Sequence, residues 1–170
     1  MRRTFAVVAL AVVTMALSGC GPRDYEYVRP NLPSQAAAFI ADSKLRNPDA
    51  LRPDTNVYLV AVDGKLIGPH GLNDRTILAP GPHAIRFGVR KASLVSGDAW
   101  GFGDTQLIAE AGKIYTLRAT EPAGISAFCS TSTGWLESED GTPASDKVPV
   151  MIARFTGGVM MVSHTHCPPR

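Results

Sequence analysis

Residues 56–67 read NVYLVAVDGKLI, and this stretch decides the fold class. Its first seven residues are mostly apolar or β-branched on both faces, which predicts a central strand covered on both sides. Asp63 and Gly64 follow directly. Gly adopts a positive φ freely and Asp tolerates one, so this pair predicts the tight turn of a β-hairpin.

Residues 83–91, HAIRFGVRK, show the alternation of a half-buried strand. One face carries His83, Ile85, Phe87 and Val89. Arg86, Arg90 and Lys91 form a basic stripe, which is typical of a solvent-facing surface but would also suit an anionic partner. The preceding Pro-Gly-Pro at 80–82 predicts a turn.

Further short strands separated by turns are expected along the rest of the chain. Alternation or turn chemistry predicts them at residues 105–111, 113–120, 124–130, 148–155 and 159–167. Residues 36–45 fit a helix and a strand equally well. The pattern predicts an all-β fold, an antiparallel β-sandwich or open barrel, with one domain over residues 35–170.

Three turn motifs carry a resemblance over about residues 38–120. These are Asp63-Gly64-Lys65, Pro80-Gly81 with His83, and Ala111-Gly112-Lys113 with Tyr115. The pattern resembles many small, uncharacterised bacterial lipoproteins and the PEGA-like and transthyretin-like β-sandwich modules. The resemblance implies a sandwich that serves in envelope adhesion or scaffolding, and it assigns no catalytic residue.

The first twenty residues have the organisation of an export signal. Arg2 and Arg3 precede an uncharged apolar run at 5–17, which would reach about 20 Å as a helix, too short to span a bilayer. Leu17-Ser18-Gly19-Cys20 resembles the bacterial lipobox. That resemblance implies a signal peptide at 1–19 and acylation of Cys20. With Gly21 next, it also implies an outer-membrane lipoprotein facing the periplasm.

Residues 20–34 contain three prolines and predict an extended tether between the lipidated N-terminus and the domain. In the alternative interpretation, Tyr25, Tyr27 and Val28 pack onto the domain.

Without residues 1–19 the chain carries fifteen basic and fifteen acidic side chains. This balance gives no electrostatic reason to bind nucleic acid, and no motif calls for a cofactor.

Two cysteines remain beside Cys20, at positions 129 and 167. In the oxidising periplasm such a pair is expected to form a disulfide that fastens the C-terminal strand.

His164 and His166 lie two residues apart, so they would share a face of a strand and could contact one metal ion. Two histidines fall short of the ligands that zinc needs, so a metal site is the alternative interpretation.

The Gly-rich stretch VSGDAWGFGD at 95–104 is expected to be a loop carrying Trp100 and Phe102. The two rings would either contact a partner or lie buried over one end of the sandwich.

No GxSxG or GxGxxG motif occurs in the sequence. The sequence therefore predicts a non-enzymatic, membrane-anchored binding or scaffolding lipoprotein. The alternative is a lipoprotein that handles copper or zinc through its C-terminal histidines.

Overall fold

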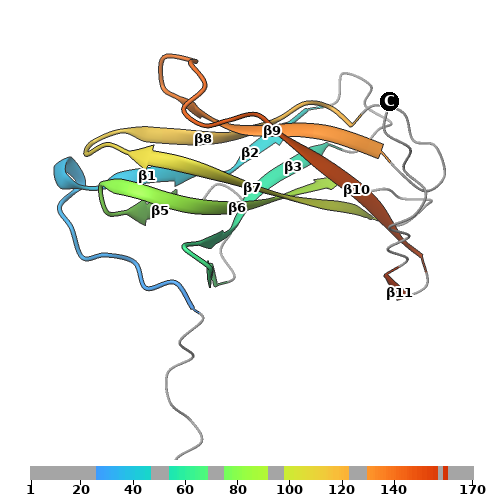
Figure 1. Cartoon of the computed structure of the whole chain (residues 1–170), viewed down its shortest axis with the longest axis horizontal. Coiled ribbons are helices and arrows are strands. Elements are labelled where there is room, and N and C mark those ends of the chain that lie inside the picture. Colours follow the sequence, from blue (N-terminus) through green and yellow to red (C-terminus); the bar gives the residue numbers. More distant parts are fainter. Residues whose placement is uncertain are drawn as a thin grey trace, which may run out of the picture.

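The described part of the chain folds mainly into β-strands, as the computed structural model in Figure 1 shows. The structure describes residues 26–46, 54–68, 75–91, 98–122, 130–156 and 159–160. A single 3₁₀ turn, η1 (Ser34–Ala36), precedes the strands. The strands are β1 (Ala38–Ala41), β2 (Ser43–Leu45), β3 (Thr55–Val62), β4 (Lys65–Leu66), β5 (Arg75–Leu78), β6 (Gly81–Lys91), β7 (Ala99–Ala109), β8 (Ile114–Ala119), β9 (Ser130–Ser138), β10 (Val148–Thr156) and β11 (Val159–Met160). The prediction of an all-β fold is confirmed.

The strands form one curled sheet in the order β2-β3-β6-β7-β10-β9-β8-β1-β5, with β4 paired to β3 and β11 to β10. The curl produces a half-barrel, and β1 contacts β3 while β2 contacts β8, so the two ends of the sheet approach each other. β1 and β8 run parallel, whereas the other ladders are antiparallel. The expectation of a purely antiparallel sheet is therefore wrong at this one pair.

Residues 38–45 are extended, which decides between the helix and the strand that the sequence left open. β1 pairs with β5 and β8, and β2 pairs with β3. Asp42 lies between the two strands, and its Oδ1 accepts a hydrogen bond of 3.0 Å from the backbone N–H of Leu59. The segment thus changes its pairing partners at Asp42 and connects the two ends of the curled sheet.

The predicted hairpin turn lies between β3 and β4. Asp63 has φ 52° and Gly64 has φ 77°, the left-handed pair that a two-residue turn requires. The prediction that β3 is covered on both sides is wrong, because its residues alternate between buried and half-buried up to Val60. A bulge between Leu59 and Ala61 shifts the register with β6, and the alternation ends there.

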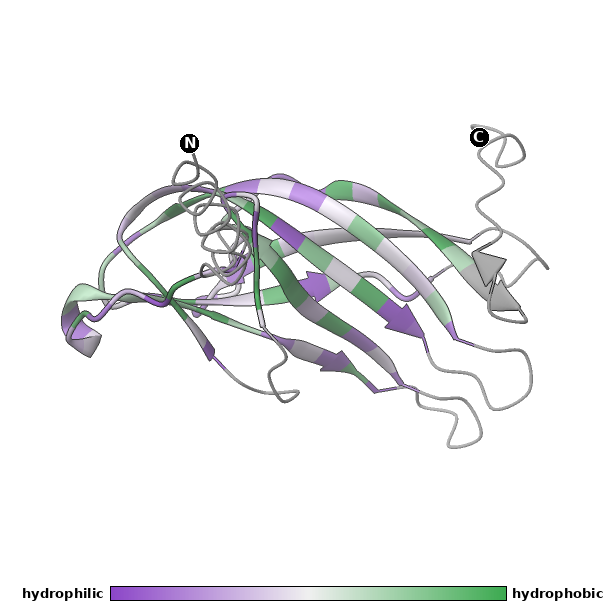
Figure 2. Ribbon diagram, turned by 90° about the horizontal axis from the view of Figure 1, so that it is seen from below, coloured by the Kyte–Doolittle hydropathy of each residue, from purple (hydrophilic) through white to green (hydrophobic). Residues whose placement is uncertain are grey.

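Alternating side chains of both halves of the sheet build one hydrophobic core. Figure 2 shows hydrophobic and hydrophilic residues alternating along the strands. Phe87, Leu59 and Val57 contribute from one half, and Leu117, Leu136 and Ile40 from the other. The face predicted for Ile85, Phe87 and Val89 is buried, and Tyr115, Leu117 and Ala119 of β8 are buried as well.

The Gly-rich stretch around Trp100 is a strand, not the predicted loop. It forms the first half of β7, which pairs with β6 from Gly81↔Ala109 to Lys91↔Ala99. Gly103 of β7 and Gly134 of β9 leave room for the Phe87 ring of β6. A Cβ on Gly103 would lie 2.6 Å from Cζ of Phe87, and one on Gly134 would lie 2.3 Å from its Cε2.

The segment before the domain packs against it at Tyr27. The Tyr27 N–H donates to the Leu66 carbonyl at 2.8 Å, and its hydroxyl donates to the Ile77 carbonyl at 2.9 Å. Val28 is 80% exposed. Of the two interpretations of residues 20–34, packing therefore holds for Tyr27 and does not hold for Val28.

No helix among the residues that the structure describes has the length and apolarity to cross a membrane.

Candidate functional site

The outer face of β3, β6, β7 and β10 carries a row of aromatic and apolar residues. Tyr58 pairs with Gly88, and Gly88 pairs with Phe102 on the next strand. Ile152 pairs with Gly101, which brings Met151 beside Phe102. Phe102 is 46% exposed and Met151 is 57% exposed, large fractions for such side chains.

Trp100 adjoins this row and completes what we call the aromatic patch, defined as Tyr58, Trp100, Phe102 and Met151. The rings of Trp100 and Tyr58 meet edge to face, with centroids 6.0 Å apart and an interplanar angle of 90°. The Arg90 guanidinium lies 4.7 Å from the centroid of Trp100, a cation–π distance. Arg90 Nε and Nη2 also donate to Asp98 Oδ2 at 2.9 and 2.6 Å. These contacts hold the Trp100 ring in one orientation.

Tyr58 lies flat across β6 because its neighbour there has no side chain. A Cβ on Gly88 would lie 2.4 Å from Tyr58 Cζ and 2.6 Å from its hydroxyl oxygen. Burial raises the pKa of Tyr58 to about 12, against an opposing effect of Arg90. The phenol therefore stays protonated at neutral pH and can donate a hydrogen bond.

A hollow of about 340 Å³ lies beside the aromatic patch. The rings of Tyr58 and Trp100 contribute to its lining, with Leu66 and Ile67 from the β3–β4 hairpin. Asp42, Asn56 and Arg90 are its polar or charged lining residues. Its size and mostly apolar lining are those of a small-molecule site.

The predicted basic stripe is paired with acids rather than free. Arg86 donates to both carboxylate oxygens of Asp104 at 2.8 and 3.0 Å, and Asp104 raises the pKa of Arg86. Arg90 pairs with Asp98, and Lys91 forms an ion pair with Glu121. The stripe therefore presents little net positive charge to an anionic partner.

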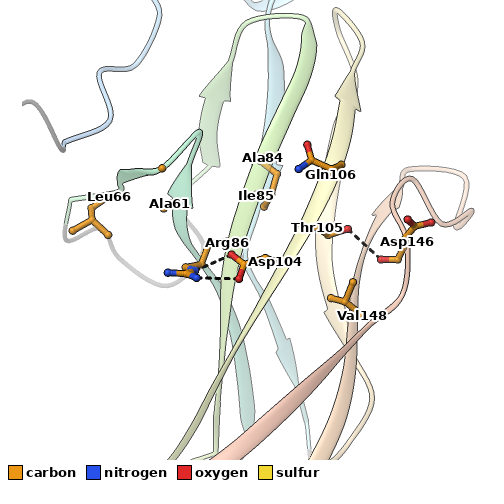
Figure 3. Close-up of a pocket in the computed structure, with 11 residues that line it drawn as sticks. Ala61, Leu66, Ala84, Ile85, Arg86, Asp104, Thr105, Gln106, Asp146 and Val148 are labelled. Carbon is orange, nitrogen blue, oxygen red and sulfur yellow. Dashed lines mark hydrogen bonds and ion pairs between the residues drawn. The ribbon is translucent and has the colours of Figure 1, made fainter.

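Figure 3 shows the Arg86–Asp104 pair within a second hollow of about 510 Å³ on the same strands. The Thr105 hydroxyl donates to the Asp146 carbonyl at 3.3 Å on one side of this hollow, and Leu66 lies on the other. Two of its charged residues, Arg86 and Asp104, already bind each other.

Both ring nitrogens of His83 lie within hydrogen-bond distance of an oxygen atom. Nδ1 lies 2.7 Å from Asp63 Oδ2, and Nε2 lies 2.8 Å from the Ala79 carbonyl oxygen. Because both ring nitrogens are engaged by these oxygens, neither is free to bind a metal ion. Within the described ranges, no three His, Cys, Asp or Glu side chains are grouped as a metal site requires.

The structure places only part of the predicted site. Trp100 and Phe102 lie on β7 and both belong to the aromatic patch. Cys20, Cys129, Cys167, His164 and His166 lie outside the described residues. The sequence missed Tyr58 and Met151, although the alternation of β3 could have placed Tyr58 on the outer face.

Comparisons with known proteins do not assign this chain to a family. No family model matches this chain, and neither the curated proteins nor the solved structures gave a match.

Proposed function

We propose that this chain is a non-enzymatic lipoprotein of the bacterial outer membrane that faces the periplasm and binds another envelope component. The observation that carries the binding role is the aromatic patch. Exposed aromatic and Met side chains gathered on a rigid sheet are typical of protein-binding surfaces, since each contributes a large apolar area with few freely rotating bonds. The proposed site is thus the outer face of β3, β7 and β10.

The membrane anchor in this proposal rests on the N-terminal sequence. The apolar run at 5–17 and the lipobox-like Leu17–Cys20 support acylation of Cys20. Because one acyl chain gives only marginal binding, stable attachment needs two or more. Mass spectrometry of the mature N-terminus should find acyl chains on Cys20, and Cys20→Ser should leave the membrane fraction. An unmodified Cys20 in a protein that stays with the membrane would contradict this part.

Photocrosslinking from the patch tests the binding role. A photoreactive residue is placed at Phe102 in intact cells, and a matched one is placed at Ile108. Both side chains point outward from β7, and Ile108 is 74% exposed. Six residues of strand separate them by about 20 Å. A discrete adduct from position 102 that is absent from position 108 supports the proposal. Identical adducts from both positions, or none from 102, would contradict it.

The alternative function, copper or zinc handling through His164 and His166, rests on sequence spacing alone. Its test is the metal titration described in the Discussion.

A further inference from the structure

The hollow beside Trp100 contains an unused hydrogen-bond acceptor. Asn56 lines this hollow, and its Oδ1 is buried without a hydrogen-bond partner among the described residues. A buried acceptor left unsatisfied costs about 1–3 kcal/mol, and native proteins contain few of them. A ligand that brings an N–H or O–H group would remove this cost.

The shape of the hollow favours a flat ring. Tyr58 and Trp100 meet at 90°, so their surfaces form a corner. A flat ring entering this corner can stack on one ring while its edge contacts the other, and both arrangements are favourable between aromatic systems. Leu66 and Ile67 add apolar surface to the lining. Gly88 is needed for this corner, because a side chain there would displace Tyr58.

The polar groups of the hollow restrict the ligand further. The Arg90 guanidinium already donates to Asp98 and stacks on Trp100. Asn56 Oδ1 and the Asp42 carboxylate are acceptors. A sugar needs partners around its whole edge, and the apolar lining supplies few. A phosphate or carboxylate would meet the Asp42 carboxylate and a guanidinium that is already paired. A mainly apolar ring with one or two donors fits best.

We infer that the hollow formed by Tyr58, Trp100, Leu66 and Asn56 binds a small aromatic compound with a hydrogen-bond donor, of the phenol or indole class. The ring occupies the Tyr58–Trp100 corner, and its donor binds Asn56 Oδ1, which a rotation of the half-buried Asn56 side chain exposes to the hollow. This site shares Tyr58 and Trp100 with the aromatic patch but includes neither Phe102 nor Met151. A protein partner on Phe102 and Met151 and a small ligand in the hollow can each be present without the other.

The two tryptophans of the chain allow a test with an internal control. Trp100 lines the hollow, whereas Trp135 lies on β9 beneath Lys147, whose Nζ is 4.8 Å from its ring centroid. Purified full-length protein is titrated with p-cresol and, separately, with toluene, which lacks only the hydroxyl. The two indole N–H signals are followed by NMR and assigned with Trp100→Phe. We expect saturable movement of the Trp100 signal alone, with toluene binding at least fivefold more weakly than p-cresol.

The variant Asn56→Leu measures the contribution of the acceptor to binding separately from that of the apolar lining. This variant should bind p-cresol about five- to tenfold more weakly and toluene no more weakly than the unchanged protein. Ile108→Ala, on the same sheet face but outside the hollow, should leave both affinities unchanged. The inference is overturned if both tryptophan signals move together, if toluene binds as tightly as p-cresol, or if folded Asn56→Leu binds p-cresol normally.

The comparison of p-cresol with toluene needs no variant, so the inference stays testable if Asn56→Leu does not fold. It also uses no envelope component. A negative titration would therefore leave the crosslinking result from Phe102 standing, and the reverse holds as well.

Discussion

Phe87 and Gly134 are packed so closely that a methyl group on Gly134 would lie 2.3 Å from the Phe87 ring. Phe87 comes from β6 and Gly134 from β9, so the ring bridges the interior between the two halves of the sheet. Gly103 lies against the same ring from β7. The large side chain and the two glycines therefore form one packing unit at the centre of the core.

Gly134→Ala should lower the free energy of unfolding by about 1–3 kcal/mol, because the fully buried Phe87 ring has no free space to move into. Denaturant unfolding measures this loss. The double variant Phe87→Leu/Gly134→Ala should be more stable than the sum of the two single losses predicts, since a smaller side chain makes room for the methyl group. Strict additivity of the two changes would show that the two residues do not share space.

Gly88→Ala should have a different outcome, although its Cβ would lie equally close to a ring. Tyr58 is only half-buried and can turn toward solvent. We expect a loss of stability smaller than that of Gly134→Ala, together with a changed near-UV circular dichroism because the Tyr58–Trp100 contact is broken. An unchanged aromatic spectrum would mean that the backbone, not the ring, had moved.

Asp63 should contribute stability that is lost in acid. Burial alone would raise the pKa of Asp63, but hydrogen bonds from His83 and the Ala84 N–H lower it overall. A lowered pKa means that folding favours the carboxylate. The contribution is therefore complete above the ordinary value of 3.8 and disappears as the pH falls through the lowered pKa.

Asp63→Asn tests this, since Asn also tolerates the positive φ at this turn. The variant should be less stable than the unchanged protein by up to about 1 kcal/mol near pH 6, a small effect because Asp63 is half exposed. The difference in melting temperature should shrink toward pH 3. Glu139→Gln, which removes the same charge from an exposed turn, is the control. A difference that does not change with pH would contradict the role of the carboxylate.

Cys129 and Cys167 should form a disulfide. Thiol counting on denatured, non-reduced protein should find no free thiol when Cys20 is acylated. The closed loop predicts about 4 kcal/mol of stabilisation at most, which strain in the native state would reduce. Reduction should therefore lower the melting temperature. Two free thiols, in protein isolated from the periplasm, would refute the pairing.

His164 and His166 would bind one zinc or copper ion if the alternative function holds. Titration of the purified protein with each metal, followed by calorimetry, should then show one equivalent bound, and binding should be lost in His164→Ala and His166→Ala. His83→Ala is a control that should not change it, because the ring of His83 is held by Asp63 and Ala79. Absence of stoichiometric binding would end the metal interpretation.

Local features of the fold were predictable from sequence because they depend on neighbouring residues. The Asp63–Gly64 turn follows from the φ values that these two residue types tolerate, and the inward faces of β6 and β8 follow from two-residue periodicity. The aromatic pair Trp100 and Phe102 was found as a candidate contact. Its placement on a strand was missed, because glycine has low strand propensity.

What the sequence could not provide depends on residues far apart in the chain. Gly103 of β7 is explained by the Phe87 ring that fills the space beside it, and Gly101 by the Met151 carbonyl oxygen of β10, which would lie 2.5 Å from its Cβ. Tyr58 becomes part of the candidate site only because Gly88 pairs with it and Trp100 lies next to it. The parallel pairing of β1 with β8 has no local signal, since a parallel ladder depends on how the whole chain crosses over.

That parallel pair also determines when the domain can be completed. Phe39 pairs with Ile77 of β5 on one side and with Ile114 of β8 on the other, so β1 lacks its second neighbour until most of the chain has been synthesised. Contacts between such distant residues give a high contact order and slow folding. We expect the newly made chain to remain unfolded for longer than it would with only hairpin neighbours, which would suit the export proposed for it.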